Sequence, residues 1–564
     1  MQLIIKILNK SFGADMLAII ALVGSLVMAQ YIAAALLIFM LISGKALEKY
    51  ATRKASSALE ALAKRLPSSA HRRINGAISE VAIGEIAIGD EIVIYPHETC
   101  PVDGNIIEGS GTMDESYLTG EPYQILKTVG SLVLSGAING DSVIVIRAEK
   151  LAQDSRYAKI MTVMKEAEER RPQLMRLADE IGAIFAPLAL TFAATTWYFT
   201  GDILRFIAVL TVATPCPLLI AIPITVIGAI SLAARNGIII KDPTVLERLP
   251  TCSTAIFDKT GTLTYGEPKF TEILVAQGFA ADDILQKTAS LERYSRHPLA
   301  VAIMNALAEK NLELLEATQV SERSGQGLSG IVLGQEIMVT SRNKVLKQNP
   351  QLASSIAATD SGLECLIMIN QQYAATLRFH DAPRADSHSF IHHLGPEHNF
   401  KKIVLLSGDR ASEVNYLAAL LNIKQTHASQ SPEQKLEFVK NETALAPTLF
   451  MGDGINDAPA LTAATVGIAF GQNNNITSEA AGAVILENTL TKVDELLHIS
   501  ISMRRIAMQS AVGGMLLSLL GMGFAAAGML SPAEGALLQE VIDVAAILNA
   551  LRITWRGKIV SDVK

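Results

Sequence analysis

The segment that most constrains the fold of this chain is residues 254–264, TAIFDKTGTLT, where a short apolar run ends abruptly in an acid, a base and several hydroxyl and glycine residues. An apolar run of this length is typical of a buried strand. Open α/β sheets bind their ligands at the carboxyl ends of their strands. The segment therefore predicts that Asp258 stands at the functional edge of a sheet, followed directly by Lys259 and Thr260.

Two later segments repeat this pattern, KIVLLSGD at residues 402–409 and TLFMGDGIND at residues 448–457. Three parallel strands would bring Asp258, Asp409 and Asp453 to one edge, where their carboxylates repel one another and require a cation. Hard oxygen ligands favour Mg²⁺, and an aspartate beside Mg²⁺ is the kind of nucleophile that forms an aspartyl phosphate from ATP. The alternative, in which each Gly-Asp merely ends a strand, is disfavoured by the threefold repetition.

The composition indicates a membrane protein of several domains. The 564 residues are enough for more than one hydrophobic core. Hydrophobic residues make up 50% of the chain and charged residues 18%, and the mean hydropathy is +0.32, which predicts membrane helices. The net charge of -7 gives no indication of nucleic-acid binding. The four cysteines form no CxxC pair and suggest neither a disulfide framework nor a zinc site.

Apolar segments along the chain predict six membrane helices, so we expect an integral, multi-pass protein of the lipid bilayer. The expected spans are residues 3 or 15 to 28, 29–47, 181–199, 203–232, 506–529 and 535–551. Lys and Arg are frequent at residues 45–73, 235–248 and 504–505 but scarce in the connections near Thr200 and Met529. By the positive-inside rule the large domains lie in the cytosol, and the cell membrane is the expected location.

The fourth expected span contains two prolines that bracket a cysteine, ATPCPL at residues 213–218. Each proline removes a backbone donor and clashes with the preceding turn, so the helix is expected to unwind there. Broken helices at membrane depth are tolerated where they line a cavity, and a thiolate there is a soft metal ligand. The pattern makes Cys216 a candidate ligand of a transported metal; the alternative is a small buried hydrophobic residue.

The last expected span carries Gln539, Glu540 and Asp543 within an otherwise apolar stretch. A carboxylate at the centre of the bilayer costs roughly 3 kcal/mol on insertion scales, so it should face a cavity, a cation or a partner. Glu540 and Asp543 are therefore further candidates for the transported metal. The alternative places them near the interface as merely hydrated groups.

These motifs resemble those of the P-type ATPases, ion pumps that phosphorylate and dephosphorylate the aspartate of DKTGT. The matching segments are TGEP at residues 119–122, DKTGTLT at 258–264 and GDGINDAPAL at 452–461, and they span nearly the whole chain. The resemblance implies that ATP is the substrate, that Asp258 is phosphorylated, and that Mg²⁺ is held by Asp258, the carbonyl of Thr260, and Asp453. It implies catalytic roles for Lys259, Thr260, Ser407, Gly408, Asp409, Lys435, Asn456 and Asp457, and for Thr119, Gly120 and Glu121, with Glu121 orienting the attacking water.

A finer resemblance is to the branch of this family that transports transition metals. Residues 214–216, TPC, stand where that branch carries CPC, SPC or CPH. The resemblance implies that Glu292 and His297 bind the nucleotide, His297 with Pro298 matching the His-Pro pair beside adenine. Gly325 and Gly327 resemble the GxG that lets the backbone approach the nucleotide.

The resemblance implies a multidomain α/β fold with an α-helical membrane domain. The expected parts are a membrane helix pair at 1–48, a stalk and β-rich actuator domain at 49–165, a second pair with the kinked helix at 166–240, and a third at 496–564. The segment 48–73 is charged, helix-forming and amphipathic, which predicts the helical stalk, and the alternating pattern from there to Lys150 predicts the small β-rich domain. A haloacid-dehalogenase-like Rossmannoid phosphorylation domain is expected at 241–266 and 382–495, interrupted by an α+β nucleotide-binding domain at 267–381.

The sequence thus predicts ATP-driven transport of a divalent transition-metal cation, outward from the cytosol. A mixed thiolate and carboxylate site favours Zn²⁺, Co²⁺, Fe²⁺, Ni²⁺ or Mn²⁺ over Cu⁺, which prefers all-soft ligands. One alternative is a pump for another cation, with Cys216 purely structural. A second is a membrane-anchored haloacid-dehalogenase-like phosphatase or sensor without transport. The sequence does not indicate an oligomeric state.

Overall fold

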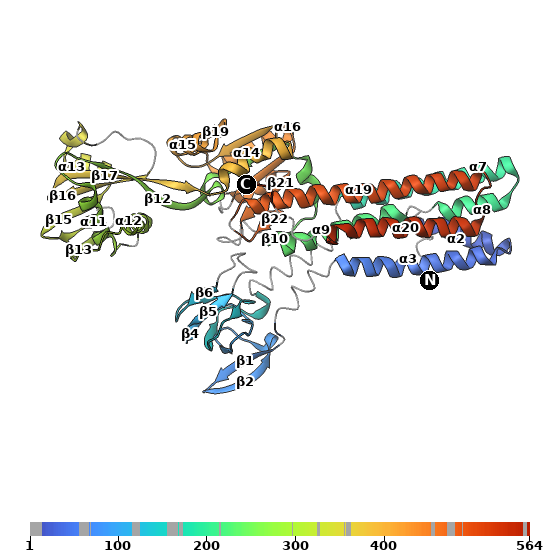
Figure 1. Cartoon of the computed structure of the whole chain (residues 1–564), viewed down its shortest axis with the longest axis horizontal. Helices are drawn as coiled ribbons and strands as arrows, with labels where there is room; N and C mark the ends of the chain where they lie inside the picture. The colour runs from blue at the N-terminus through green and yellow to red at the C-terminus, as the bar shows by residue number, and fades with distance from the viewer. Residues whose placement is uncertain are drawn as a thin grey trace. The chain divides into compact units, whose positions relative to one another are not determined.

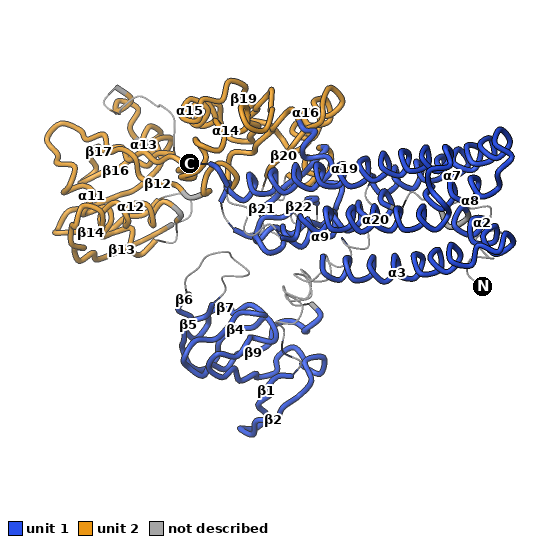
Figure 2. The backbone as a smooth tube through the Cα atoms, turned by 45° about the vertical axis from the view of Figure 1, so that its right-hand side comes forward, with its two compact units in different colours: residues 1–252, 465–563 blue, residues 253–464, 564 orange. Residues whose placement is uncertain are grey.

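The computed structural model describes residues 14–55, 67, 69–114, 124–154, 167, 173–213, 216–295, 297–323, 327–354, 356, 363–452, 457–470, 480–487, 489–555 and 561–563. The chain divides into two compact units, which Figure 2 distinguishes by colour. Unit 1 comprises residues 1–252 and 465–563, and unit 2 comprises residues 253–464 together with residue 564.

Long apolar helices of unit 1 pack side by side (Figure 1). They are α2 (Ala14–Val27), α3 (Tyr31–Ala55), α7 (Gln173–Thr200), α8 (Ile203–Val212), α9 (Cys216–Arg235), α19 (Thr491–Ala526) and α20 (Pro532–Trp555). Among the described residues, four segments are long and apolar enough to cross a membrane, namely α3, α7, the stretch from α8 through α9, and α19. The two other expected spans fall on α2, which has 14 described residues, and on α20, which carries Glu540 and Asp543 within its apolar sequence.

The expected break in the fourth span is confirmed. α8 ends at Val212 and α9 begins at Cys216, and the backbone of Ala213 already leaves the helical region at φ -78° and ψ 49°. Pro223 lies inside α9 and Pro187 inside α7, yet both helices continue past them. Helix α8 therefore stops shortly before two closely spaced prolines, whereas α7 and α9 continue past a single proline. Residues 214 and 215 lie outside the described part of the chain.

Two apolar clusters fill the helical bundle at different levels. One includes Leu37, Met40, Val212, Ala213 and Ala536. The other is lined by Ala51, Ala55, Ala221, Ile224, Ile547 and Ala550. α3 and α20 contribute to both clusters, and the segment from α8 through α9 contributes to the first with α8 and to the second with α9. The residues between the two clusters therefore occupy an intermediate level of the bundle.

The β-rich part of unit 1 forms the small domain that the alternating sequence predicts. A six-stranded sheet has the order β2-β1-β3-β9-β4-β7, and a three-stranded sheet has the order β6-β5-β8. The strands are β1 (Ser69–Ile74), β2 (Ala77–Ala82), β3 (Glu91–Ile94), β4 (Gly104–Glu108), β5 (Gly111–Asp114), β6 (Gln124–Lys127), β7 (Leu132–Val133), β8 (Ile138–Asn139) and β9 (Ile144–Ala148). The charged segment 48–73, expected as a helical stalk, is helical up to Ala55 in α3, but its last residues belong to β1, because they pair with β2 and β3.

The segment after α9 forms the strand β10 (Ile238–Ile240) and the short helix α10 (Thr244–Arg248). β10 pairs antiparallel with β22 (Ala483–Ile485), which pairs in parallel with β21 (Val466–Phe470). The Glu247 side chain of α10 accepts hydrogen bonds from the backbone N–H groups of Gln173 and Leu174, both at 3.0 Å. The first N–H groups of a helix have no partner within the helix, so Glu247 ties α10 to the start of α7.

Unit 2 contains the three parallel strands that the sequence predicts. β11 (Thr254–Phe257) lies between β18 (Lys402–Leu406) and β20 (Thr448–Gly452) and pairs in parallel with both. β19 (Gln425–His427) extends the order to β20-β11-β18-β19. The helices of this part are α14 (Ser387–His398), α15 (Ala411–Leu421), α16 (Pro432–Leu445) and α17 (Ala458–Ala463).

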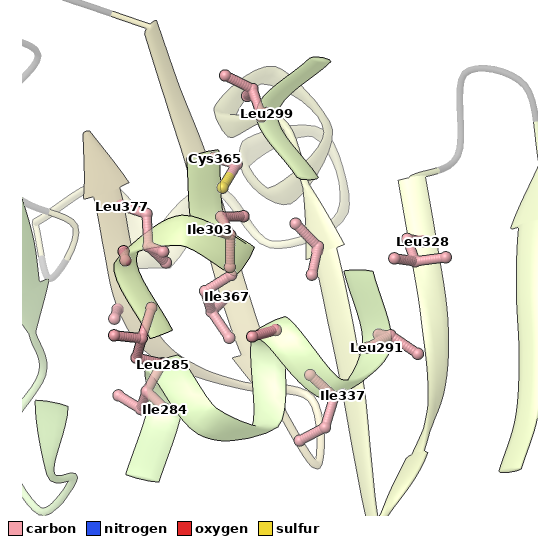
Figure 3. Close-up of a cluster of buried hydrophobic side chains, with 14 of the residues drawn as sticks. Ile284, Leu285, Leu291, Leu299, Ile303, Leu328, Ile337, Cys365, Ile367 and Leu377 are labelled. Atoms are coloured by element: carbon pink, nitrogen blue, oxygen red, sulfur yellow. The ribbon is translucent and has the colours of Figure 1, made fainter. Parts of the chain in front are cut away.

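The rest of unit 2 is a six-stranded antiparallel sheet in the order β12-β17-β16-β15-β14-β13. Its strands are β12 (Thr264–Val275), β13 (Ala317–Arg323), β14 (Gly327–Val332), β15 (Gln335–Thr340), β16 (Leu363–Ile369) and β17 (Gln372–Pro383), and its helices are α11 (Ala281–Glu292), α12 (Pro298–Glu309) and α13 (Arg342–Gln348). Figure 3 shows aliphatic side chains of α11 and α12, such as Leu285 and Ile303, packed against strand residues such as Ile367 and Leu377. Asp258 follows β11 and Asp381 lies near the end of β17, so both sheets deliver residues to the same region.

Two adjacent glycines of α19, Gly513 and Gly514, allow a test of how closely this helix packs in the bundle. A methyl group at Gly514 would overlap the side chain of Pro217, whereas one at Gly513 would meet no atom within 4 Å. We expect Gly514→Ala to lower the free energy of unfolding by about 1–3 kcal/mol through overpacking, and Gly513→Ala to leave it unchanged or raise it by up to about 1 kcal/mol. Thermal unfolding of the purified protein in detergent measures both, and equal midpoints for the two variants would contradict the close contact of α19 with the start of α9.

Candidate functional site

A buried lysine joins two carboxylates at the carboxyl edge of the parallel strands. Lys435 Nζ lies 2.6 Å from Asp258 Oδ1 and 2.8 Å from Asp457 Oδ1. Lys435 is 6% exposed, Asp258 7% and Asp457 1%. The strand β11 ends one residue before Asp258, whose backbone N–H donates to the carbonyl of Met451 at 2.8 Å. The site is therefore built on the backbone of two paired strands.

Local sequence signals place the other two members of this cluster. Ser431 and Gln434 form a capping box that starts α16, and Lys435 follows on the buried face of its first turn. Asp457 is the N-cap residue of α17 and lies close to Gly452, where a Cβ atom would come within 2.5 Å of the carboxylate. A glycine at the end of β20 is thus needed for Asp457 to approach Lys435.

Burial and the neighbouring carboxylate of Asp457 raise the pKa of Asp258 above its ordinary value, while Lys435 opposes this rise. A carboxylate in this setting is poorly hydrated and has one oxygen held by a cation. Such a group can attack an electrophilic phosphorus atom, and the ammonium can neutralise charge on the phosphoryl group that it receives.

Lys259, Thr260 and Asp409 form a second set of contacts beside Asp258. Lys259 Nζ lies 2.8 Å from Asp409 Oδ2, and the Thr260 hydroxyl donates to the same oxygen at 3.2 Å. Ser407 is buried, and its hydroxyl accepts from the backbone N–H of Asp409 at 3.1 Å. The structure thus brings Asp258 and Asp409 to one edge, as the three strand-end acids predict.

Two residues of the segment FHDAPR hold the turn after Asp258, and sequence reasoning assigned neither a role. Asp381 accepts from the Thr264 hydroxyl at 2.5 Å and from the Gly266 N–H at 3.0 Å, and it lies 3.4 Å from Lys259. The buried guanidinium of Arg384 donates to the carbonyls of Gly261 and Thr262. The signal that could have found them is an Asp near the end of a long strand and an Arg directly after it, where the chain returns to the parallel sheet.

A cavity of about 410 Å³ opens in the antiparallel part of unit 2. Its lining includes the predicted nucleotide residues Glu292, His297 and Gly327, together with Glu322 and Glu364. Several acidic side chains in one wall disfavour a triphosphate but suit the amine and ring of a purine base. Gly327 has φ +86°, and a side chain there would overlap the backbone of β15, so its backbone can form the wall directly.

Glu292 is 5% exposed, and its Oε2 atom is buried with no hydrogen-bond partner among the residues that the structure describes. Burial and the nearby Glu322 raise the pKa of Glu292 to about 7. His297 is the N-cap of α12, where its Nδ1 accepts from the Leu299 N–H at 3.3 Å. This bond holds the ring among the residues that line the cavity.

Polar side chains of the helical bundle meet between the two apolar clusters. Ser518 donates to Gln539 Oε1 at 3.0 Å, and Gln539 Nε2 donates to Asp543 Oδ1 at 2.8 Å. Ser43 donates to Glu540 Oε1 at 2.8 Å. We call these five residues the polar layer. Sequence reasoning missed Ser43 and Ser518, for which a hydroxyl within an apolar helix is the available signal.

Several predicted site residues lie outside the described residues, namely Thr119, Gly120, Glu121, Gly325, Asp453 and Asn456. Cys216 is described in its backbone only, as the first residue of α9. Gly408 lies in the loop after β18, against the carbonyl of Gln430.

Comparison with known proteins agrees with this arrangement. Residues 64–165 match the P-type ATPase actuator domain, and residues 252–465 match the haloacid dehalogenase-like hydrolases. The chain is 32% identical to a silver exporting P-type ATPase of Salmonella typhimurium, over 94% of this chain and 67% of that protein. It is also 32% identical to copper-exporting P-type ATPase B of Archaeoglobus fulgidus, over 92% of this chain and 77% of that protein.

The fold resembles a solved structure over almost its entire length. The crystal structure of a zinc-transporting PIB-type ATPase in the E2.Pi state matches with a TM-score of 0.63 and 27% identity, covering 98% of this chain and 92% of that one. The chain therefore belongs to the P-type ATPases, in the branch that transports heavy metals. Its hydrolase part, actuator part and apolar helices make it a multi-pass membrane ATPase, and the alternative of a phosphatase without transport is not favoured.

Exchange of the bridging lysine tests the catalytic cluster. In Lys435→Met two buried carboxylates face each other without a cation, so we expect formation of the acid-stable phosphoenzyme from labelled ATP to slow by about 100-fold or more. Lys440→Met changes an exposed lysine of the same helix and should leave the rate unchanged. A wild-type rate in Lys435→Met would contradict the role of the lysine.

The nucleotide cavity predicts a pH dependence of ATP binding. As pH rises through about 7, Glu292 ionises and adds a second charge beside Glu322, so the dissociation constant of ATP should rise about fivefold between pH 6 and 8. Glu292→Gln keeps the neutral form and should flatten this dependence, whereas Glu336→Gln, at an exposed position of β15, should retain it. Equal pH profiles in wild type and Glu292→Gln would exclude Glu292 from the site.

Proposed function

We propose that this protein is an ATP-driven pump that moves a divalent transition-metal cation out of the cytosol across the cell membrane. The ATP-hydrolysing part of this proposal rests on Lys435, which donates to Asp258 and Asp457 at the end of the parallel strands. The polar layer beside the break between α8 and α9 supports the transport half.

In the proposed reaction an oxygen of Asp258 attacks the γ-phosphorus of ATP, and the bond from that phosphorus to the bridging oxygen of ADP breaks. Lys435 neutralises charge on the transferred group, and Lys259 and Thr260, held by Asp409, keep the turn in place. Ser407 and Gly408 help to hold the phosphate in this proposal, and Asn456 and Asp457 complete its binding site. Glu121, with Thr119 and Gly120, orients the water that later cleaves the aspartyl phosphate.

The donor atoms fit Mg²⁺. The Asp258 and Asp453 carboxylates and the Thr260 carbonyl would hold the ion, and hard oxygen ligands of this kind are those it prefers. Bound there, Mg²⁺ supplies charge neutralisation for the triphosphate. ATP itself would place its base in the cavity lined by Glu292, His297 and Gly327, with Gly325 nearby in the chain.

The packing of α19 supports one shared site for Cys216 and α20. Gly521 packs against Val212 and Gly514 against Pro217, so α19 runs along the broken segment from one side of it to the other. Ser518 lies between these glycines on α19 and donates to Gln539. Cys216, Glu540 and Asp543 are therefore proposed as cargo ligands at one level of the bundle.

The donor set indicates the class of cargo. The relatives are named for silver, copper and zinc, which span soft monovalent and borderline divalent ions. The polar layer offers carboxylate and amide oxygens, and Cys216 of the broken segment would add one thiolate; such a set favours a divalent ion over Cu⁺ or Ag⁺. We propose Zn²⁺, Co²⁺, Fe²⁺, Ni²⁺ or Mn²⁺.

Transport requires that the two sites influence each other. By linkage, if the cargo changes the reactivity of Asp258, then phosphorylation changes the affinity for the cargo. The contact of Glu247 with the start of α7 supports a coupling role for the segment that leads from α9 to β11.

Phosphorylation in the presence of different metals tests the proposal. We expect one of Zn²⁺, Co²⁺, Fe²⁺, Ni²⁺ and Mn²⁺ to stimulate acid-stable phosphoenzyme formation from labelled ATP, with Cu⁺ and K⁺ as comparisons. Asp258→Asn should abolish the signal, and Cys216→Ala and Glu540→Ala should raise the metal concentration for half-maximal phosphorylation by about tenfold or more. Cys252→Ala, at a buried cysteine of unit 1 outside the helical bundle, should not. A phosphoenzyme that forms equally well without any metal would contradict the transport half.

A further inference from the structure

Glu540 differs from its neighbours in the polar layer by facing α3. Gln539 and Asp543 are connected to Ser518 of α19, whereas Glu540 is connected to Ser43. The Ser43 hydroxyl lies 2.8 Å from Glu540 Oε1 and 3.2 Å from the carbonyl of Met40 in the preceding turn. The shorter distance identifies the glutamate as its principal acceptor.

The second oxygen of Glu540 is unusual. Oε2 is buried and has no hydrogen-bond partner among the residues that the structure describes. Burying a carboxylate oxygen without a partner is costly, and a membrane interior makes the cost greater. A buried oxygen atom without a partner calls for a functional explanation. A bound cation is the partner that would compensate the charge of the Glu540 carboxylate.

The position of Ser43 along α3 matches that of Glu540 along α20. On α3, Met40 belongs to one apolar cluster and Leu47 packs against the other, with Ser43 between them. On α20, Ala536 belongs to the first cluster and Ile547 to the second, with Glu540 between them.

The break between α8 and α9 lies at this same level. Ala213 belongs to the first cluster and Ala221 to the second, and the segment between them includes Cys216. Ser43 lies on α3 and Glu540 on α20. These two helices and the segment from α8 through α9 thus have apolar residues on both sides of one polar level.

We infer that Ser43 is a positioning residue for the cargo: by donating to Oε1 it orients the Glu540 carboxylate so that Oε2 remains available as a cargo ligand. α3 thereby takes part in the cargo site without contacting the ion. This inference rests on the proposed function, since it assumes that Glu540 binds the transported metal. A hydroxyl suits the task because it holds one oxygen and leaves the carboxylate its charge.

Metal titrations of phosphoenzyme formation test this role. Using Zn²⁺, Co²⁺, Fe²⁺, Ni²⁺ and Mn²⁺ separately with the 564-residue chain, we expect Ser43→Ala to raise the half-maximal concentration of the stimulating metal by about tenfold, the loss expected for one hydrogen bond to a charged group. The phosphorylation level at saturating metal should stay unchanged, since Ser43 touches no reacting atom. Ser43→Thr retains the hydroxyl and should stay within about twofold of wild type.

Ser25 provides a matched control. It is a fully buried serine of α2 whose hydroxyl has no hydrogen-bond partner among the described residues, so Ser25→Ala makes the same change in another membrane helix. We expect it to leave the metal dependence as in wild type. An equal rise in Ser25→Ala and Ser43→Ala would mean that any loss of bundle packing weakens the metal response, and would overturn the inference.

A double-mutant cycle separates positioning from packing. If Ser43 acts through Glu540, then Ser43→Ala should change the metal dependence less than twofold in a Glu540→Gln background. Additive effects of the two changes would overturn the inference. A metal response in wild type that Ser43→Ala leaves intact would overturn it too, with the proposed function standing. A wild type that responds to none of the metals would overturn both.

Discussion

A carboxylate removed from water has to be matched by a cation, by hydrogen-bond donors or by a proton, and this constraint shapes each candidate site of the protein. Asp258 and Asp457 share the ammonium of Lys435. Glu247 is satisfied by two backbone N–H groups at the start of α7. For Glu292, burial and the neighbouring Glu322 raise the pKa to about 7, so this carboxyl group takes up a proton more readily than usual. We propose that the three arrangements serve three tasks: a reactive group, a structural link and one wall of a nucleotide site.

The order of elements along the chain links these sites. α9 begins at the break that carries Cys216, and it continues into β10 and α10, where Glu247 ties the segment to α7. β11 follows and ends at Phe257, directly before Asp258. If α9 shifts when a metal binds, the backbone connects that shift to Asp258, the residue that we propose is phosphorylated. The two hydrogen bonds from Glu247 to the start of α7 are suited to such coupling, because packed elements move as units and do not deform continuously.

Local sequence signals were enough for the elements that carry the chemistry. The strands β11, β18 and β20 are short apolar runs that stop at acids, and their parallel pairing is confirmed. The break after Val212 is confirmed as well, since paired prolines act through covalent geometry and need no tertiary context. The charged segment 48–73 was less well predicted, because the pairing of β1 with its neighbours decides its last residues. Propensity is a weak prior where tertiary contacts are available.

Side-chain partners across large sequence separations could not be predicted in the same way. The sequence around Arg384 can draw attention to this residue, but it does not identify the carbonyls of Gly261 and Thr262 as its partners. In the same way, the sequence around Ser43 does not identify Glu540 as its partner. Such pairs depend on the register of whole helices and strands, in which one residue of slip changes the face that a side chain occupies. The roles of Glu121, Asp453 and Asn456 remain predictions from resemblance, because these residues lie outside the described part of the chain.

The polar layer shows why the type of partner matters for transport. A lysine beside Glu540 would neutralise it permanently and compete with a divalent ion for the same carboxylate. A serine orients the carboxylate but leaves its charge in place, so the attraction for an incoming cation is kept. The proposed catalytic role requires the opposite arrangement, since Lys435 would stabilise the negative charge that arrives with each phosphoryl group. The protein thus pairs the buried Asp258 with an ammonium where we propose that it receives an anion, and the half-buried Glu540 with a neutral hydroxyl where we propose that it receives a cation.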